Sequence, residues 1–248
     1  MIVDWYFDAN YSHGFLVIPV AIFLFWRKRK ELVFPARPSG WGIFTFGLGC
    51  VGLILGIAAS EFFTTRISLL IIITGISLYH LGLENFRKVW FAFFFLIFMV
   101  PIPAVIYFSA TVPMQLFSSK VTGFILQVIG VPSVRQGNII YLPQYTLEVV
   151  EACSGLRSLV TLLALSSLYG YLTLPGKIRP VILFLAAIPI AIVSNIIRLA
   201  LTAIGAYAVS TYLAESFLHE ISGLLVFAFA IALVITTGAF LKWPERRS

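Results

Sequence analysis

The sequence predicts an all-α protein, a polytopic membrane bundle of about seven transmembrane helices, with eight as the alternative. Three observations lead to this prediction. The 248 residues are 60% hydrophobic and 11% charged, whereas a soluble domain is about 45–50% apolar and about 25% charged. The apolar residues form long runs, most of them near the length of about 20 residues that crosses a bilayer. Charged residues gather in the short segments between these runs. One domain over residues 1–248 is the simplest organisation.

Four apolar runs occupy the first part of the chain, at residues 13–26, 41–59, 67–83 and 89–107. The second run contains Gly47, Gly49 and Gly52 in the spacing of a dinucleotide-binding turn. No strand precedes these glycines, so we interpret them, together with Cys50, as close helix packing. Prolines 101 and 103 are expected to kink or end the fourth helix.

The middle of the chain is more polar. Residues 109–131 mix serine, glutamine and lysine with large apolar side chains. This mixture is typical of an amphipathic helix lying in the membrane interface, and a transmembrane span is the alternative. Two short apolar runs flank a Pro143-Gln144 break and predict a short extended, extracytoplasmic segment over residues 132–150. Three more spans are expected at residues 155–172, 181–206 and 221–240.

The positions of lysine and arginine predict the orientation. With the N-terminus outside and seven spans, most of the 17 basic residues fall on the cytoplasmic side, as the positive-inside rule requires. These residues are dispersed between apolar runs rather than gathered on one face, which argues against a nucleic-acid partner. Membrane lipid is the expected surrounding. The sequence indicates no cofactor.

Cys153 is the first candidate for chemistry. It stands just before the apolar run at 155–172, where a helix N-terminus would favour a thiolate through its unpaired N–H groups and its dipole. Arg157 follows four residues later and adds positive charge on the same helical face. The alternative is a buried structural cysteine.

Two further residues are expected at the same depth. Arg198 lies near the outer end of the sixth span, and His219 opens the seventh on the outer side. Because a charge within a span is costly, Arg198 is a functional candidate, although it could instead pair with a glutamate. Asn195 precedes Arg198 by one turn. Cys153 and His219 alone provide too few ligands for a metal site.

Other kinds of protein remain in view. A non-enzymatic transporter or assembly scaffold with a structural Cys/Arg/His cluster is the main alternative, since polar residues in membrane helices also line permeation paths. A thiol–disulfide oxidoreductase would need a second cysteine near Cys153, whereas Cys50 lies in another span. A rhomboid-like serine protease would use Ser154 in a Gly-x-Ser-Gly sequence, but position 152, where the first glycine would stand, is alanine.

Several segments together resemble the exosortase/archaeosortase family. They are Glu151-Ala152-Cys153-Ser154-Gly155-Leu156-Arg157-Ser158, Asn195-Ile196-Ile197-Arg198, His219 with Ser222-Gly223, Tyr11-Ser12-His13-Gly14 and the run from Gly137 to Pro143. Histidine at 219 looks like the bacterial branch. The resemblance covers most of the chain. It implies a multi-pass protein of the bacterial inner membrane that processes proteins carrying a C-terminal sorting tail, made of a Pro-Glu-Pro-like sequence, a membrane helix and a basic cluster.

The resemblance also implies a thiol protease or transpeptidase mechanism on the extracytoplasmic side. Cys153 would attack the scissile carbonyl and form a thioester, His219 would transfer the proton, and Arg198 would stabilise the oxyanion. Supporting or substrate-binding roles would fall to Arg157, Asn195, Ser154 and Glu151. The acceptor, the natural substrate and the oligomeric state are left open.

Overall fold

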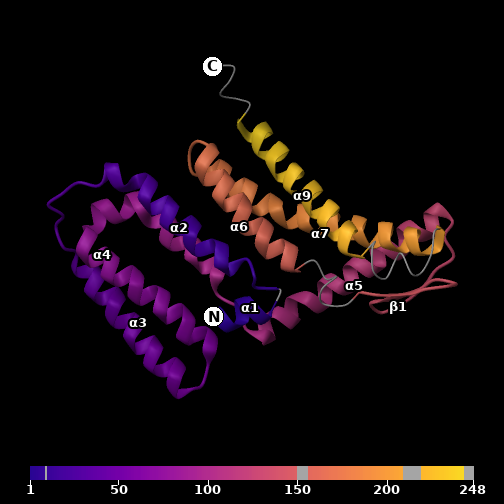
Figure 1. Cartoon of the computed structure of the whole chain (residues 1–248), viewed down its shortest axis with the longest axis horizontal. Helices are drawn as coiled ribbons and strands as arrows, with labels where there is room; N and C mark the ends of the chain where they lie inside the picture. The colour runs from indigo at the N-terminus through magenta and orange to yellow at the C-terminus, as the bar shows by residue number, and fades with distance from the viewer. Residues whose placement is uncertain (9, 150–155, 209–218, 243–248) are drawn as a thin grey trace. The chain divides into compact units, whose positions relative to one another are not determined.

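The computed structural model describes residues 1–8, 10–149, 156–208 and 219–242, and side chains in the last helix from Ser222 onward. These residues are mostly helical (Figure 1), which confirms the all-α prediction. The chain forms two compact units, Met1–Pro103 and Ala104–Ser248. The organisation as one domain stays a prediction.

The first unit is helical throughout. Its elements are α1 (Ile2–Phe7), α2 (Gly14–Lys28), the 3-10 turn η1 (Arg29–Glu31), α3 (Gly40–Ala58), α4 (Phe62–Phe95) and the 3-10 turn η2 (Leu96–Met99). Helices α3 and α4 form its most extensive packing contact. A short turn joins them, and Glu61 caps the start of α4 by accepting hydrogen bonds from the Phe63 and Thr64 amides.

Glycines on α3 allow this close packing. A Cβ added at Gly49 would lie 2.7 Å from Ile72, and one added at Gly56 would lie 2.7 Å from the Thr65 hydroxyl. A larger residue at either position would push the two helices apart. The packing interpretation is therefore confirmed at Gly49 and Gly56, and it is wrong at Gly47, where an added Cβ would meet no described atom within 4 Å. Cys50 is a free, half-buried cysteine on the same helix.

A break divides α4 at Gly82. This residue has φ 71° and ψ 167°, which is not a helical conformation and favours glycine. The Arg37 carbonyl also occupies the space that a Cβ would need. Three residues later, the buried Asn85 amide donates to the Val33 carbonyl and accepts from the Val33 amide, both at 2.8 Å. The break lies at the end of the predicted third span, just before the charged residues.

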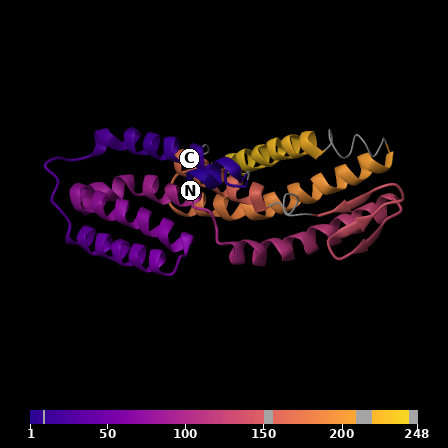
Figure 2. The same cartoon turned by 60° about the horizontal axis from the view of Figure 1, so that its bottom comes forward.

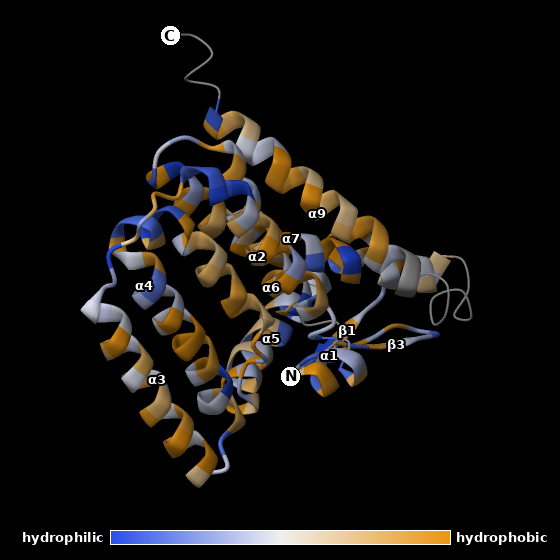
Figure 3. Cartoon of the chain, turned by 60° about the vertical axis from the view of Figure 1, so that its left-hand side comes forward, coloured by the Kyte–Doolittle hydropathy of each residue, from blue (hydrophilic) through white to orange (hydrophobic). Residues whose placement is uncertain are grey.

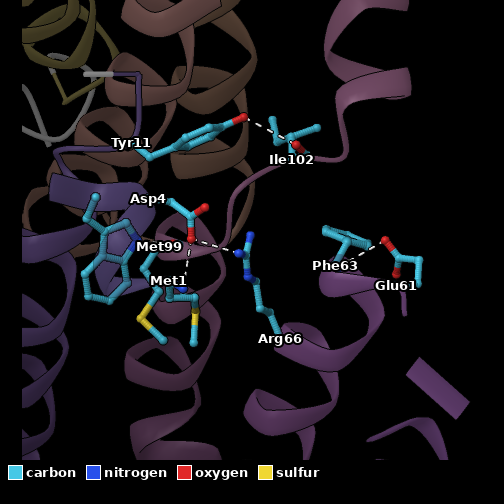
Figure 4. Close-up of polar contacts among 9 residues, drawn as sticks. Met1, Asp4, Tyr11, Glu61, Phe63, Arg66, Met99 and Ile102 are labelled. Carbon is cyan, nitrogen blue, oxygen red and sulfur yellow. Dashed lines mark hydrogen bonds and ion pairs between the residues drawn. The ribbon is translucent and has the colours of Figure 1, made fainter. Parts of the chain in front are cut away.

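Side chains near the N-terminus bind backbone carbonyls at the end of η2 and just after it (Figure 4). Trp5 Nε1 donates to the Met99 carbonyl at 2.9 Å, and the Tyr11 hydroxyl donates to the Ile102 carbonyl at 3.3 Å. His13 Nε2 lies 3.1 Å from the Phe98 carbonyl. This segment cannot continue as a helix because Pro101 and Pro103 lack N–H groups. Side chains from the start of the chain therefore satisfy carbonyls that the helix ladder leaves open.

The prolines end the fourth predicted helix earlier than expected. Helical structure stops at Met99, and the next helix begins at Ala104. The prediction of one helix over residues 89–107 was therefore wrong in its last part. Residues 104–107 belong to α5.

The second unit combines helices with a small sheet. Its elements are α5 (Ala104–Ile129), β1 (Val134–Gln136), β2 (Ile139–Tyr141), β3 (Thr146–Glu148), α6 (Leu156–Thr173), α7 (Ile178–Ala208) and α9 (His219–Lys242). The strands form an antiparallel sheet in the order β1-β2-β3. The extended segment predicted over residues 132–150 is confirmed, and β1 is a strand that the sequence did not indicate.

Two apolar clusters hold the second unit together. One joins α6, α7 and α9 through Leu162, Leu183, Ala187, Ala191, Ala230 and Val234. The other joins α5 and the sheet to the last turns of α7 through Leu126, Ile140, Leu147, Val149, Leu199 and Ala203. Figure 2 shows the strands beside α5 and the end of α7. Helix α7 has 31 residues, or about 46 Å, and therefore reaches both clusters.

Helix α5 buries its polar side. Its buried residues include Thr111, Gln115, Ser118, Ser119 and Thr122, while many of its large apolar residues are exposed. The Ser119 hydroxyl donates to the Gly137 carbonyl at 2.9 Å, which ties the helix to the β1–β2 turn. An exposed apolar side and a covered polar side suit a helix in contact with lipid. Its placement in the interface stays a prediction.

The helices are those of a multi-pass membrane protein, and apolar residues dominate α3 and α9 (Figure 3). By length and composition, four helical segments among the described residues could cross a membrane, namely Gly40–Ala58, Phe62–Met99, Ile178–Ala208 and Ser222–Lys242. The second of these includes the Gly82 break and covers two predicted spans. Helix α2 has 15 residues, and α6 carries several serines and threonines. The count of seven or eight spans is not confirmed.

Candidate active site

The sequence-predicted residues around the cysteine fall partly outside the described residues. Glu151, Cys153 and Ser154 lie outside the described residues. Helix α6 begins at Leu156, so the helix predicted after the cysteine is confirmed. Arg157 is exposed in its first turn, and its carbonyl accepts a hydrogen bond from the Thr161 hydroxyl at 3.0 Å.

Helices α7 and α9 bring Arg198 next to the first turns of α9. A Cβ added at Gly223 would lie 3.9 Å from Arg198 Nη1. Position 219 precedes Gly223 by four residues and therefore occupies the same face of α9. The backbone of His219 begins this helix, and its imidazole lies outside the described side chains. The structure thus places the Arg198 guanidinium beside the helical face that carries position 219.

Buried polar residues surround Arg198 along α7. Asn195 is one turn earlier and buried, and Ser194 is buried beside it. Ser222, next to Gly223 on α9, is buried as well. Among the described residues, neither the Ser194 hydroxyl nor the Ser222 hydroxyl has a hydrogen-bond partner. A buried polar group without a partner is costly, so each of these hydroxyls could donate a hydrogen bond to a further polar group or accept one from it.

Sequence reasoning did not single out Ser194, and it noted Ser222 only as part of a family segment. The signal for Ser194 is its spacing, because a residue four positions before Arg198 lies on the same helical face. For Ser222 the signal is weaker. Its proximity to Arg198 depends on how α9 packs against α7, and the sequence alone does not contain that information.

Comparison with protein families identifies the chain. Residues 5–236 match the profile of the family described as Transmembrane exosortase (Exosortase_EpsH). The chain belongs to this family. No curated protein and no solved structure matches this chain. The matched part of this exosortase includes three features: the N-terminal side chains that bind carbonyls in and just after η2, the three-stranded sheet, and helices α7 and α9. The resemblance inferred from the sequence is confirmed.

Among the residues that the structure describes, no group of three histidine, cysteine, aspartate or glutamate side chains lies close enough together to hold a metal ion.

Substitutions at Gly223 test whether the space beside Arg198 matters to this exosortase. We expect Gly223→Ala to keep most of the processing activity, because the added Cβ would make an ordinary contact with Arg198 at 3.9 Å. Gly223→Leu should reduce processing at least about tenfold, since a branched side chain would displace the guanidinium. A loss of about 1.4 kcal/mol of transition-state stabilisation is enough for a tenfold lower rate. The measurement is the rate of substrate-tail processing by membranes containing each variant.

The matched control enlarges the neighbouring residue. Leu224 is 70% exposed, so Leu224→Trp should insert and process normally. Full activity of Gly223→Leu would show that Arg198 does not act beside this turn of α9.

Proposed function

We propose that this chain is a membrane-embedded cysteine protease or transpeptidase that cleaves C-terminal sorting tails on the extracytoplasmic side of the bacterial inner membrane. Membership of the exosortase family supports the general class. The observation that carries the proposal for this chain is the position of the Arg198 guanidinium against the first turns of α9. The buried Ser194 hydroxyl, one turn before Arg198 and without a hydrogen-bond partner among the described residues, adds support.

The proposed reaction is acyl transfer. The Cys153 thiolate attacks the scissile carbonyl of the tail, and the tetrahedral intermediate collapses to a thioester as the amine leaves. His219 gives the leaving amine its proton. An acceptor amine, or water, then attacks the thioester after losing a proton to His219. This second step forms the new amide or acid and restores the thiolate.

Arg198 is proposed to stabilise the negative charge that develops on the carbonyl oxygen. A guanidinium suits this role because it is always charged and directs several N–H groups in one plane. Asn195, buried one turn earlier, would hold Arg198 in position. Arg157 would favour the thiolate or bind an acidic residue of the tail, and Ser154 and Glu151 would support the site.

The proposed side of the membrane follows from charge. Lys177 and Arg179 stand at the start of α7, and Lys242 lies in the last turn of α9. With these basic ends in the cytoplasm, as the positive-inside rule favours, Arg198 and position 219 belong to the opposite side.

The test is coexpression with a reporter that ends in a Pro-Glu-Pro-type tail, followed by mass spectrometry of the reporter. We expect a new C-terminus at or next to the Pro-Glu-Pro sequence, either free or joined to an acceptor. The matched control reporter carries alanines in place of this sequence and keeps its membrane helix and basic cluster. An intact tail on the first reporter, in cells where the chain is inserted in the membrane, would contradict the proposal.

A further inference from the structure

The outer edge of β3 is open among the described residues. The sheet order β1-β2-β3 places β3 at one side, with β2 as its described strand partner. Its residues Thr146 and Glu148 are exposed, whereas Leu147 between them is buried. An open edge carries unpaired N–H and C=O groups that can bind another extended chain.

The direction of the backbone groups follows from the register. The Val149 amide donates to the Asn138 carbonyl at 2.9 Å, and the Tyr145 carbonyl accepts from the Leu142 amide at 2.8 Å. Residues 145 and 149 therefore direct their backbone groups toward β2. Because this direction alternates along a strand, Thr146 and Glu148 direct their N–H and C=O groups away from the sheet.

Burial holds this strand in one register. Leu147 and Val149 are 4% and 0% exposed and pack in the cluster that contains Leu199 and Ala203 of α7. A shift by one residue would move both apolar side chains to the exposed face. Strand β3 therefore packs against α7, the helix that carries Arg198.

The strand also leads toward the proposed nucleophile. Cys153 follows Glu148 by five residues, and five extended residues span at most about 17 Å. The peptide proposed below would therefore pair with a strand whose last residue, Glu148, is joined to Cys153 by a chain of at most that length. Strand addition is also a common way for proteins to bind extended peptides, since main-chain hydrogen bonds give affinity independently of most side chains.

We propose that the outer edge of β3 binds the extended part of the sorting tail as an added strand. This inference rests on the proposed function and specifies how the same site takes its substrate. A Pro-Glu-Pro-type sequence suits such a strand. Its prolines are two residues apart, so both missing N–H groups point to one edge, and the residue between them presents its N–H and C=O to the other.

Charge selects between the two available registers. In an added antiparallel strand, the acidic residue between the prolines stands opposite either Thr146 or Glu148, because only these residues direct their backbone outward. Two carboxylates directly opposite each other are destabilising. The acidic residue of the tail therefore pairs with Thr146.

The first experiment uses the purified chain in lipid nanodiscs and a synthetic tail peptide with a single N-methylated amide. Methylation of the amide between the prolines should slow processing roughly tenfold, because it removes a hydrogen-bond donor and adds bulk at the paired edge. Methylation three residues before or after the acidic residue, where the amide points to the same edge as the prolines, should change the rate less than about threefold. Equal effects at both kinds of position would overturn the inference. If the unmethylated peptide itself is not processed, the proposed function fails instead.

The second experiment alters the edge. Thr146→Pro removes an outward N–H of β3, and we expect roughly tenfold slower processing. The matched control is Arg135→Pro, which removes the outward N–H of β1 on the opposite side of the sheet and should leave processing near normal. Equal rates for the two variants would contradict tail binding at β3. A shift from dimer to monomer in Thr146→Pro, measured by light scattering, would assign the edge to a second copy of the chain and also overturn the inference.

Discussion

Replacing Cys153 with alanine is expected to abolish processing of the sorting tail. Alanine has no nucleophile, and the thioester that links the two half-reactions cannot form. We expect the rate to fall to the background of the reporter in cells without the chain. Both the cleaved reporter and any acceptor adduct should disappear from the mass spectrum, while the variant remains in the membrane fraction.

The other cysteine provides the matched control. Cys50 is half-buried on α3, among the glycines that contact α4. Cys50→Ala removes one sulfur from a packed helix and should keep most of the activity, at a modest cost in stability. Substantial processing by Cys153→Ala would rule out the thiol mechanism. Loss of activity in both variants with loss of membrane insertion would indicate a folding defect, and Cys153→Ser then provides a closer replacement.

Arg198 is expected to give the second large effect. Loss of one oxyanion donor typically costs about 10²–10³ in rate, so Arg198→Ala should be inactive to within that range. Arg198→Lys should also be severely impaired, because an ammonium is a point charge without the planar set of donors. Both variants should insert normally, as judged by extraction from the membrane and by thermal stability in detergent.

A control on the same helix distinguishes catalysis from packing. Arg179 lies at the start of α7, at the end opposite Arg198, and Arg179→Lys should keep normal processing. If Arg198→Ala is nearly as active as the parent, Arg198 has no part in the site and the Cys153–His219 pair acts alone. If Arg198→Lys is fully active, charge alone is sufficient and the oxyanion role is wrong.

Much of the helical structure could be predicted from local sequence. Apolar runs with few charges form α3, α7 and α9 near their predicted bounds, since such residues favour burial in lipid or protein whatever their neighbours. Gly49 and Gly56 on α3 were correctly interpreted as packing residues, because a close contact between helices needs small side chains. That their partner is α4, through Ile72 and Thr65, is visible only in the structure.

Other features depend on contacts between distant residues. Strand β1 has weak local signals, and it forms because β2 supplies its hydrogen-bond partners. The prolines that end the fourth predicted helix were visible in the sequence, but the partners of the freed carbonyls, Trp5 and Tyr11 from the start of the chain, were not. The polar side of α5 was visible in the sequence, but its burial depends on the sheet and α7.

The sequence by itself named the residues proposed for the site: a cysteine before a helix, an arginine in an apolar run and a histidine at the next helix start. These residues could be named because a charge in lipid and a thiol at a helix N-terminus are unusual wherever the rest of the chain lies. The tertiary structure decided that Arg198 lies beside Gly223 of α9 and that β3 stands at the edge of the sheet formed by the described strands. Both depend on helix packing and strand pairing between residues far apart in the chain, which local preferences do not encode.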